Sequence, residues 1–206
     1  GQLHSADPDE RVEASWMLAV VLRQQGRLEE ALVAARRYRA TRGEQSRPGA
    51  APTTALLEAQ VLFEQGAYRA AAALFDSVAR GRVSGEDSSA VSRNRVWALT
   101  HAAGVLAAQG DTTRLAGLAD TIRVLGRQSA FARDQRLHYY VDGLLALARG
   151  RDGEAVPLFR RSILSPNVGY TRVNLVLGRT LTRLGRPREA VAILQSALRG
   201  MFEGSN

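Results

Sequence analysis

Five glycines recur along the chain, each flanked by small residues at fixed distances. The glycines are Gly26, Gly66, Gly110, Gly150 and Gly185. A small residue lies seven positions before each glycine and a small or apolar residue five positions after it, giving pairs twelve residues apart: Ala19 and Ala31, Ala59 and Ala71, Ala103 and Leu115, Gly143 and Ala155, Gly178 and Ala190. Glycine adopts the left-handed conformation that ends a helix at little cost, and small side chains let two helices approach closely. The pattern therefore predicts five antiparallel helical hairpins in an all-α protein.

Amphipathic segments on both sides of each glycine give the expected helices. Asp7 and Pro8 form a helix-start signal, with the aspartate as N-cap and the proline in the first turn. We expect a single domain over residues 1–206 whose helices span residues 8–25, 28–42, 52–65, 68–80, 88–109, 112–126, 130–149, 152–164, 169–184 and 187–200. They pair into hairpins at about 8–42, 52–80, 88–126, 130–164 and 169–200. Glycine, proline and serine in residues 43–52 and 81–87 predict loops between the hairpins.

The hairpins resemble the tetratricopeptide repeat family, whose pattern has a large residue, a Leu-Gly pair and then Ala-x3-Phe. The residues that carry the resemblance are Leu177-Gly178 with Ala190-x3-Leu194, Gly143 with Ala155-x3-Phe159, and Ala71-x3-Phe75. The resemblance covers about residues 8–200 and is weakest in the third hairpin. It implies a right-handed α-solenoid. The glycines lie 40, 44, 40 and 35 residues apart, whereas the family period is about 34, so we expect lengthened loops between the repeats.

The formal charge of +8 comes from 28 basic residues, and all of them are arginine. Complete exclusion of lysine favours GC-rich coding bias over selection for phosphate binding, in which lysine serves well. A nucleic-acid-binding α-solenoid stays an alternative, and it would concentrate arginine on its concave face. Cysteine is absent, which fits a cytoplasmic protein. No stretch approaches the roughly 18 apolar residues that span a bilayer, so no membrane association is expected.

Motifs that carry catalytic chemistry are missing. The chain has no phosphate loop, no HExxH and no nucleophile elbow. Of the three histidines, His4, His101 and His138, only His138 has a possible co-ligand, Asp142, four residues later on the same helix face. A zinc site needs three or four ligands, so we read His138 as a partly exposed helix residue and His101 as a half-buried packing residue. The sequence predicts no enzyme, no metal and no cofactor.

The family resemblance implies where a partner would bind, because the first helix of each pair lines the concave groove. Register places fifteen residues there: Trp16, Val20, Arg23, Leu56, Gln60, Phe63, Trp97, Thr100, His101, Tyr140, Leu144, Arg172, Leu175, Arg179 and Arg183. The two tryptophans are either partner anchors or packing residues between hairpins, and the sequence leaves both open.

Three arginines of the last hairpin form the most specific candidate for a binding site. Helical geometry puts Arg172, Arg179 and Arg183 within about 40° on one face, and their helix contains no acidic residue. The stripe either binds a carboxylate or acidic peptide or is a solvated face of an arginine-rich protein.

The leading functional hypothesis is a scaffold that binds a protein or peptide, or senses a ligand, within a larger bacterial regulatory protein from which this domain is excised. Besides nucleic-acid binding, the alternative is a purely structural or oligomerisation module. Such a module would expose a large apolar patch. The sequence leaves the partner and the oligomeric state open.

Overall fold

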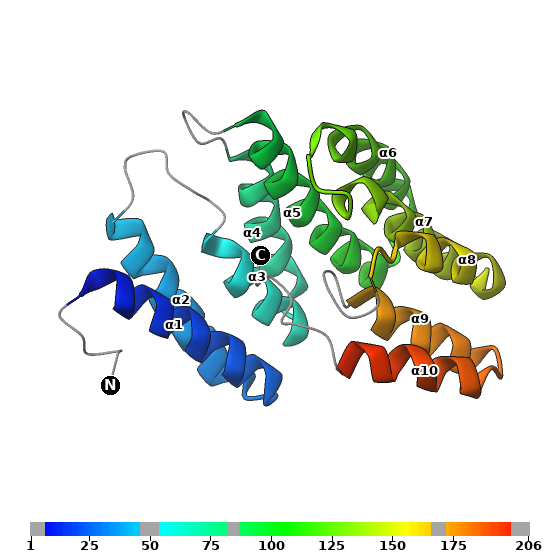
Figure 1. Cartoon of the computed structure of the whole chain (residues 1–206), viewed down its shortest axis with the longest axis horizontal. Coiled ribbons are helices and arrows are strands. Elements are labelled where there is room, and N and C mark those ends of the chain that lie inside the picture. The colour runs from blue at the N-terminus through cyan, green and yellow to red at the C-terminus, as the bar shows by residue number, and fades with distance from the viewer. Residues whose placement is uncertain (1–6, 46–53, 82–86, 166–171, 199–206) are drawn as a thin grey trace. The chain divides into compact units, whose positions relative to one another are not determined.

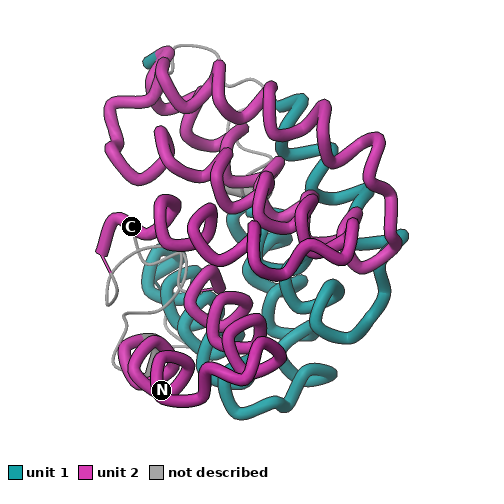
Figure 2. Tube along the Cα trace, turned by 90° about the vertical axis from the view of Figure 1, so that its right-hand side faces the viewer, with its two compact units in different colours: residues 1–87 teal, residues 88–206 magenta. Residues whose placement is uncertain are grey.

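The computed structural model describes residues 7–45, 54–81, 87–165 and 172–198. Within these ranges the chain forms ten α-helices and no β-strand (Figure 1). It divides into two compact units, residues 1–87 and 88–206 (Figure 2). The all-α prediction is therefore confirmed.

The first unit contains two helical hairpins. Its helices are α1 (Pro8–Gln24), α2 (Leu28–Gln45), α3 (Ala55–Glu64) and α4 (Tyr68–Arg80). The Asp7 side chain accepts a hydrogen bond of 2.9 Å from the Asp9 backbone N–H, as expected of an N-cap. Helix α1 packs on α2, α2 on α3 and α3 on α4, so neighbouring helices are also neighbours in sequence.

The second unit contains three hairpins. Its helices are α5 (Ser88–Gln109), α6 (Thr112–Gln128), the 3₁₀ helix η3 (Asp134–Arg136), α7 (Leu137–Ala148), α8 (Asp152–Ser162), α9 (Arg172–Arg183) and α10 (Pro187–Leu198). Helix α7 contacts α5 as well as α6 and α8. One apolar core runs through the unit and includes the fully buried Leu115, Ile122, Phe159 and Leu177.

All five hairpin turns have the same hydrogen-bonded form. Each contains a glycine with φ between 69° and 79°: Gly26, Gly66, Gly110, Gly150 and Gly185. The residue after the glycine donates its N–H to a carbonyl five residues back, as from Arg27 to Leu22 at 2.9 Å and from Arg186 to Leu181 at 2.9 Å. This bond satisfies a carbonyl that the end of a helix leaves unpaired. The predicted role of the five glycines is confirmed.

Small residues lie where the helices of a hairpin meet. Gly143 of α7 and Gly178 of α9 are both buried. A Cβ atom on Gly143 would lie 2.5 Å from Cε1 of Phe159, and one on Gly178 would lie 2.7 Å from Cδ2 of Leu194. Real Cβ atoms do not approach other atoms so closely, so a side chain at either position requires the opposing Phe159 or Leu194 side chain, or its helix, to move.

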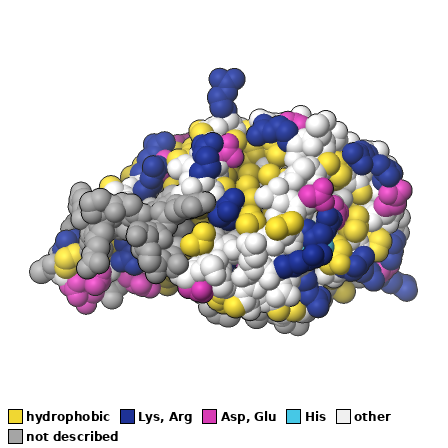
Figure 3. Space-filling view, turned by 90° about the horizontal axis from the view of Figure 1, so that it is seen from above, with side chains coloured by type: hydrophobic (Ala, Val, Ile, Leu, Met, Phe, Trp, Pro, Cys, Tyr) yellow, Lys and Arg dark blue, Asp and Glu magenta, His cyan; other side chains and the backbone are white. Residues whose placement is uncertain are grey.

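Acidic side chains pair with many of the arginines, and Figure 3 shows acidic groups beside some of the more numerous arginines on one face. Glu58 on α3 is buried, and it pairs with Arg36 Nε at 3.1 Å and Arg39 Nη1 at 2.9 Å, both from α2. On the same two hairpins, Arg23 of α1 pairs with Glu64 of α3 at 2.7 Å. Two arginines of α2 therefore join the first hairpin to the second.

One predicted helix starts in the wrong place. The sequence predicts helix over residues 130–149, but residues 129–133 form a bend and turn, η3 follows, and α7 begins at Leu137. The other predicted helices agree within a few residues. The expected starts at 52 and 169, the expected end at 200 and most of the two predicted loops lie outside the described residues.

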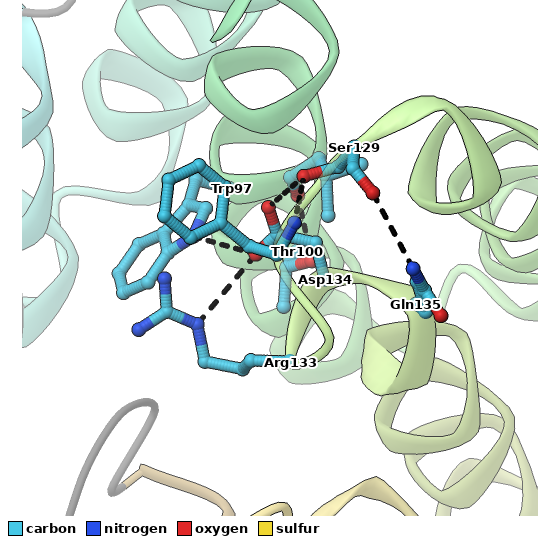
Figure 4. A network of polar contacts seen from close by, with 8 residues as sticks. Trp97, Thr100, Ser129, Arg133, Asp134 and Gln135 are labelled. Carbon is cyan, nitrogen blue, oxygen red and sulfur yellow. Dashed lines mark hydrogen bonds and ion pairs between the residues drawn. The ribbon is translucent and has the colours of Figure 1, made fainter. Parts of the chain in front are cut away.

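Asp134 explains the late start of α7, because its buried carboxylate fixes the preceding turn (Figure 4). Its Oδ1 accepts a hydrogen bond of 3.2 Å from Trp97 Nε1, and its Oδ2 accepts one of 2.6 Å from Ser129 Oγ. Arg133 Nε lies 3.5 Å from Oδ1, and the Arg133 guanidinium stacks 4.2 Å from the centroid of the Trp97 ring. A helix through residues 130–136 would pull these groups apart.

Gly126 of α6 allows the turn before α7 to pack closely on α6. A Cβ atom at this position of α6 would lie 2.6 Å from the Asp134 backbone oxygen, so the turn packs directly on the helix backbone. The turn over residues 129–136 is thus held by α5 through Trp97 and by α6 through Gly126.

We predict that Gly143→Ala destabilises the protein by about 1–3 kcal/mol, because its new methyl group overlaps the buried Phe159 ring. Gly153→Ala is the matched control. A Cβ atom on Gly153 meets nothing within 4 Å, and alanine in a helix is favoured over glycine by about 0.5–1 kcal/mol. Chemical denaturation measures both variants. Equal effects of the two substitutions would contradict the close approach of α7 and α8.

We predict that Asp134→Ala lowers the free energy of unfolding by about 3–5 kcal/mol, because it removes the fully buried carboxylate that pairs with the half-buried Arg133 guanidinium. The same variant removes the acceptor of the Trp97 and Ser129 hydrogen bonds. Asp120→Ala is the control, since the Asp120 side chain is largely exposed and its pair with Arg123 is a surface pair, worth at most about 1 kcal/mol. Denaturation curves that shift by the same amount for both variants would rule out the structural role of Asp134.

Candidate functional site

Five of the predicted groove residues are buried in the second unit. The buried residues are Trp97, Thr100 and His101 on α5, and Tyr140 and Leu144 on α7. The prediction that they are exposed to a partner is wrong, because α5 packs directly on α7 and both inward faces enter the core. The packing alternative for Trp97 is confirmed. His101 is also more deeply buried than the half-buried residue we expected, and its ring lies 5.9 Å from that of Trp97.

In the first unit, three of the predicted residues join α1 to α3. The Arg23 guanidinium donates to Glu64 at 3.0 Å and 2.7 Å, and to Gln60 Oε1 at 3.0 Å. Gln60 and Val20 are buried. These side chains are therefore engaged within the protein instead of forming an open surface, which corrects their assignment to a groove. Their contacts stabilise the joint between the first two hairpins.

Trp16, Leu56 and Phe63 are half-buried, so each presents part of its side chain to solvent. Phe63 contacts Tyr68, with 5.8 Å between the ring centroids. For Trp16, the anchor and packing alternatives both stay open.

Helix α9 keeps the predicted residues at the surface. Leu175, Arg179 and Arg183 are exposed, and Arg172 is half-buried. Arg183 Nε pairs with Asp152 Oδ2 of α8 at 2.8 Å. Sequence reasoning missed this pair because it considered acidic residues of α9 alone. Arg179, by contrast, has no ion pair or hydrogen bond to any side chain of the described residues.

A second feature of the surface was not predicted from the sequence. A hollow of about 420 Å³ is lined by Ala132, Gln135, Arg136, Tyr139 and Arg161. The first three come from the turn that Asp134 fixes and from η3, Tyr139 comes from α7, and Arg161 comes from the end of α8. Arg136 and Tyr139 are three residues apart, but only the antiparallel packing of α8 on α7 brings Arg161 to them.

Two arginines of this hollow are held in place without a carboxylate. The Arg161 guanidinium lies 4.0 Å from the centroid of the Tyr139 ring and donates a hydrogen bond of 2.5 Å to its hydroxyl. Arg136 Nη1 donates to the Ile163 carbonyl at 3.5 Å. Among the described residues, neither guanidinium forms an ion pair.

His138 lies beside the hollow, with its ring centroid 3.9 Å from that of Tyr139. Burial lowers the pKa of His138, and the nearby Arg123 and Arg161 cations lower it further against the opposing effect of Asp142. Asp142 itself pairs with Arg123 at 3.3 Å. Within the described part of the chain, no three His, Cys, Asp or Glu side chains converge closely enough to hold a metal ion.

None of the described helices combines the length and the apolar character that crossing a membrane requires.

Comparisons with known proteins agree with the repeat pattern. Tetratricopeptide-repeat family models match residues 3–51 and residues 172–196. No curated protein matches the chain.

Among solved structures, the fold is similar to that of a kinesin light chain from Podosopora anserina with nearly identical TPR-like repeats. The TM-score is 0.58 at 17% sequence identity, covering 94% of this chain and 96% of that chain. A Q17M form of the same protein gives the same TM-score and identity, over 95% and 96% of the two chains. MamA from Desulfovibrio magneticus RS-1 is also similar, with 16% identity, a TM-score of 0.48 and coverage of 91% and 93%.

The matched segments contain the first and the last hairpin, and the hairpins between them end in the same glycine turn. Tetratricopeptide repeats are therefore present at residues 3–51 and 172–196, and the fold is similar to that of a protein with TPR-like repeats.

Proposed function

We propose that this chain is a non-enzymatic scaffold that binds an acidic segment of a protein partner on the exposed face of α9. Repeat arrays of this kind present extended surfaces for binding other proteins. The observation that carries the proposal is the exposed Arg179, which lacks an acidic partner among the described residues and lies one helical turn from the exposed Leu175.

The chemistry of α9 suits a partner with a carboxylate beside an apolar side chain. A guanidinium forms two parallel hydrogen bonds to a carboxylate, which gives it both strength and direction. Arg183 is already paired with Asp152. We therefore assign carboxylate binding to Arg179, one helical turn away. Leu175 has 39% of its surface exposed and offers an apolar contact next to the charge.

The nucleic-acid alternative receives less support from the charge distribution. Duplex binding is driven by many unpaired cations along one face. Here Arg23, Arg36 and Arg39 are paired with Glu64 and Glu58. Pairing of this kind favours a local contact with a protein over tracking of a phosphate backbone.

The cellular location and the biological role of this scaffold are part of the proposal. A cytoplasmic location fits the absence of cysteine, and a regulatory role in a bacterial protein fits the arginine-only, alanine-rich composition together with a binding fold. Locating the protein in cells of its source tests the cytoplasmic setting.

We predict that Arg179→Glu weakens binding of acidic peptides at least tenfold, which is about 1.4 kcal/mol, because it replaces attraction by repulsion. The measurement uses an array of immobilised peptides in which the number of Asp and Glu residues beside a leucine is varied. Arg188→Glu is the matched control, since Arg188 is exposed on the neighbouring helix α10 and the charge change is the same. Circular dichroism confirms that both variants fold. An unchanged preference in Arg179→Glu would overturn the proposal.

A second candidate function, self-association, is favoured by an exposed apolar face on α1. Met17 and Val21 are 43% and 41% exposed, and Leu18 between them is 37% exposed. Forty positions later, in the next hairpin, Leu57 and Val61 are only 7% and 0% exposed, because α2 packs on α3.

The other half of such a joint is exposed on α10. Val191 is 52% exposed, whereas Val156, its counterpart on α8, is buried beneath the following helix. Each chain thus carries both surfaces of a hairpin-to-hairpin joint. We propose that α10 of one copy packs on α1 of a second copy, a head-to-tail contact that generates rings or filaments.

We predict that Met17→Glu and Val191→Glu each abolish this association, because each buries a carboxylate in the joint. Val33→Glu is the control, since Val33 is exposed on α2 but belongs to neither surface. Analytical ultracentrifugation should show assemblies for the parent chain and for Val33→Glu. A mixture of the Met17→Glu and Val191→Glu variants should form dimers and nothing larger, because it retains one competent joint. A monomeric parent chain would rule out self-association.

A further inference from the structure

The hollow beside α7 and α8 combines three properties. It is concave, it is lined by two guanidinium groups, and neither group has a carboxylate partner among the described residues. Two other arginines near the hollow are paired with carboxylates: Arg133 pairs with Asp134, and Arg123 pairs with Asp142.

Both guanidinium groups are held by contacts that leave donors free. Arg161 uses one nitrogen on the Tyr139 hydroxyl and lies against the Tyr139 ring. Arg136 uses one nitrogen on the Ile163 carbonyl. An arginine has five N–H donors, so most of the donors of both side chains remain available to a ligand in the hollow.

The floor of the hollow is also fixed in advance. Ala132, Gln135 and Arg136 belong to the turn and 3₁₀ helix that the buried Asp134 carboxylate holds against α5 and α6 (Figure 4). Gln135 Nε2 donates to the Ser129 carbonyl at 3.4 Å, within the same turn. A ligand would therefore bind without ordering this segment, which lowers the entropic cost of binding.

Electrostatics favour an anion at this place. Two like charges facing one hollow repel each other, and a bound anion relieves that repulsion. The lowered pKa of His138, to which Arg123 and Arg161 contribute, is consistent with positive potential around Tyr139. A neutral imidazole next to the hollow adds no third charge near pH 7.

We propose that this hollow is a binding site for an oxyanion, the carboxylate or phosphate group of a ligand, held between Arg136 and Arg161. A carboxylate and a phosphate each present a pair of adjacent oxygens to which a guanidinium donates two parallel hydrogen bonds. The site is separate from the exposed face of α9, so it does not depend on the proposed function of Arg179.

The first experiment titrates the ¹⁵N-labelled chain with inorganic phosphate, with O-phosphoserine and with N-acetylaspartate at constant ionic strength. We expect saturable shifts of the Arg136, Tyr139 and Arg161 signals with at least one of these probes. Saturation by phosphate and phosphoserine alone assigns the ligand group to phosphate, and saturation by N-acetylaspartate alone assigns it to carboxylate. The absence of saturable shifts with all three probes would overturn the proposal.

Variants separate this site from general attraction of anions. Arg136→Gln and Arg161→Gln should each weaken binding at least tenfold. Tyr139→Phe keeps the stacked ring but loses the hydrogen bond that orients Arg161, so it should weaken binding several-fold. Arg149→Gln, which removes an exposed arginine at the end of α7, is the control and should change affinity less than twofold. Equal weakening in Arg149→Gln and Arg161→Gln would show that the anions only screen net charge. Arg179→Glu should leave these titrations unchanged, whatever its effect on peptide binding.

Discussion

The close approach of the two helices in each hairpin is the contact on which the rest of the structure depends. At Gly143 and Gly178 the opposing side chains, Phe159 and Leu194, occupy the space that a Cβ atom would need. A left-handed glycine two helical turns further on then reverses the chain without leaving a carbonyl unpaired. Because each hairpin closes in this way, its outer faces are free to pack on the next hairpin.

That packing decides which side chains remain for a partner. In the second unit α5 reaches α7 directly, and the aromatic residues on their inward faces become core. In the first unit Arg23 and Gln60 are drawn into contacts that join α1 to α3. The surfaces on which we propose binding are the exposed face of α9, the hollow beside α7 and the apolar face of α1. Each has chemistry of its own, and each proposal can fail without the others.

Asp134 shows how one polar residue can redirect a segment. The helical pattern of the sequence continues through residues 130–136, and nothing in its periodicity marks a break there. The carboxylate instead accepts from Trp97 of α5 and from Ser129 of its own turn, and it pairs with the neighbouring Arg133. Burying a charge is costly unless it is fully paired, so the paired turn is favoured over another turn of helix. Arg136 reaches the hollow as a result.

The sequence by itself determined the five hairpins, their glycine turns and most helix bounds, because these depend on local backbone preferences and on side chains within one hairpin. It also placed Arg179 and Leu175 on one exposed helix face, because helical periodicity fixes which residues share a face. Only the tertiary structure decided that Tyr140 and Trp97 are buried, that Arg183 meets Asp152 and that Arg161 joins Arg136 around a hollow. These outcomes depend on how one helix packs on another. Such packing brings together residues that are far apart in the sequence, and no local sequence pattern predicts these contacts.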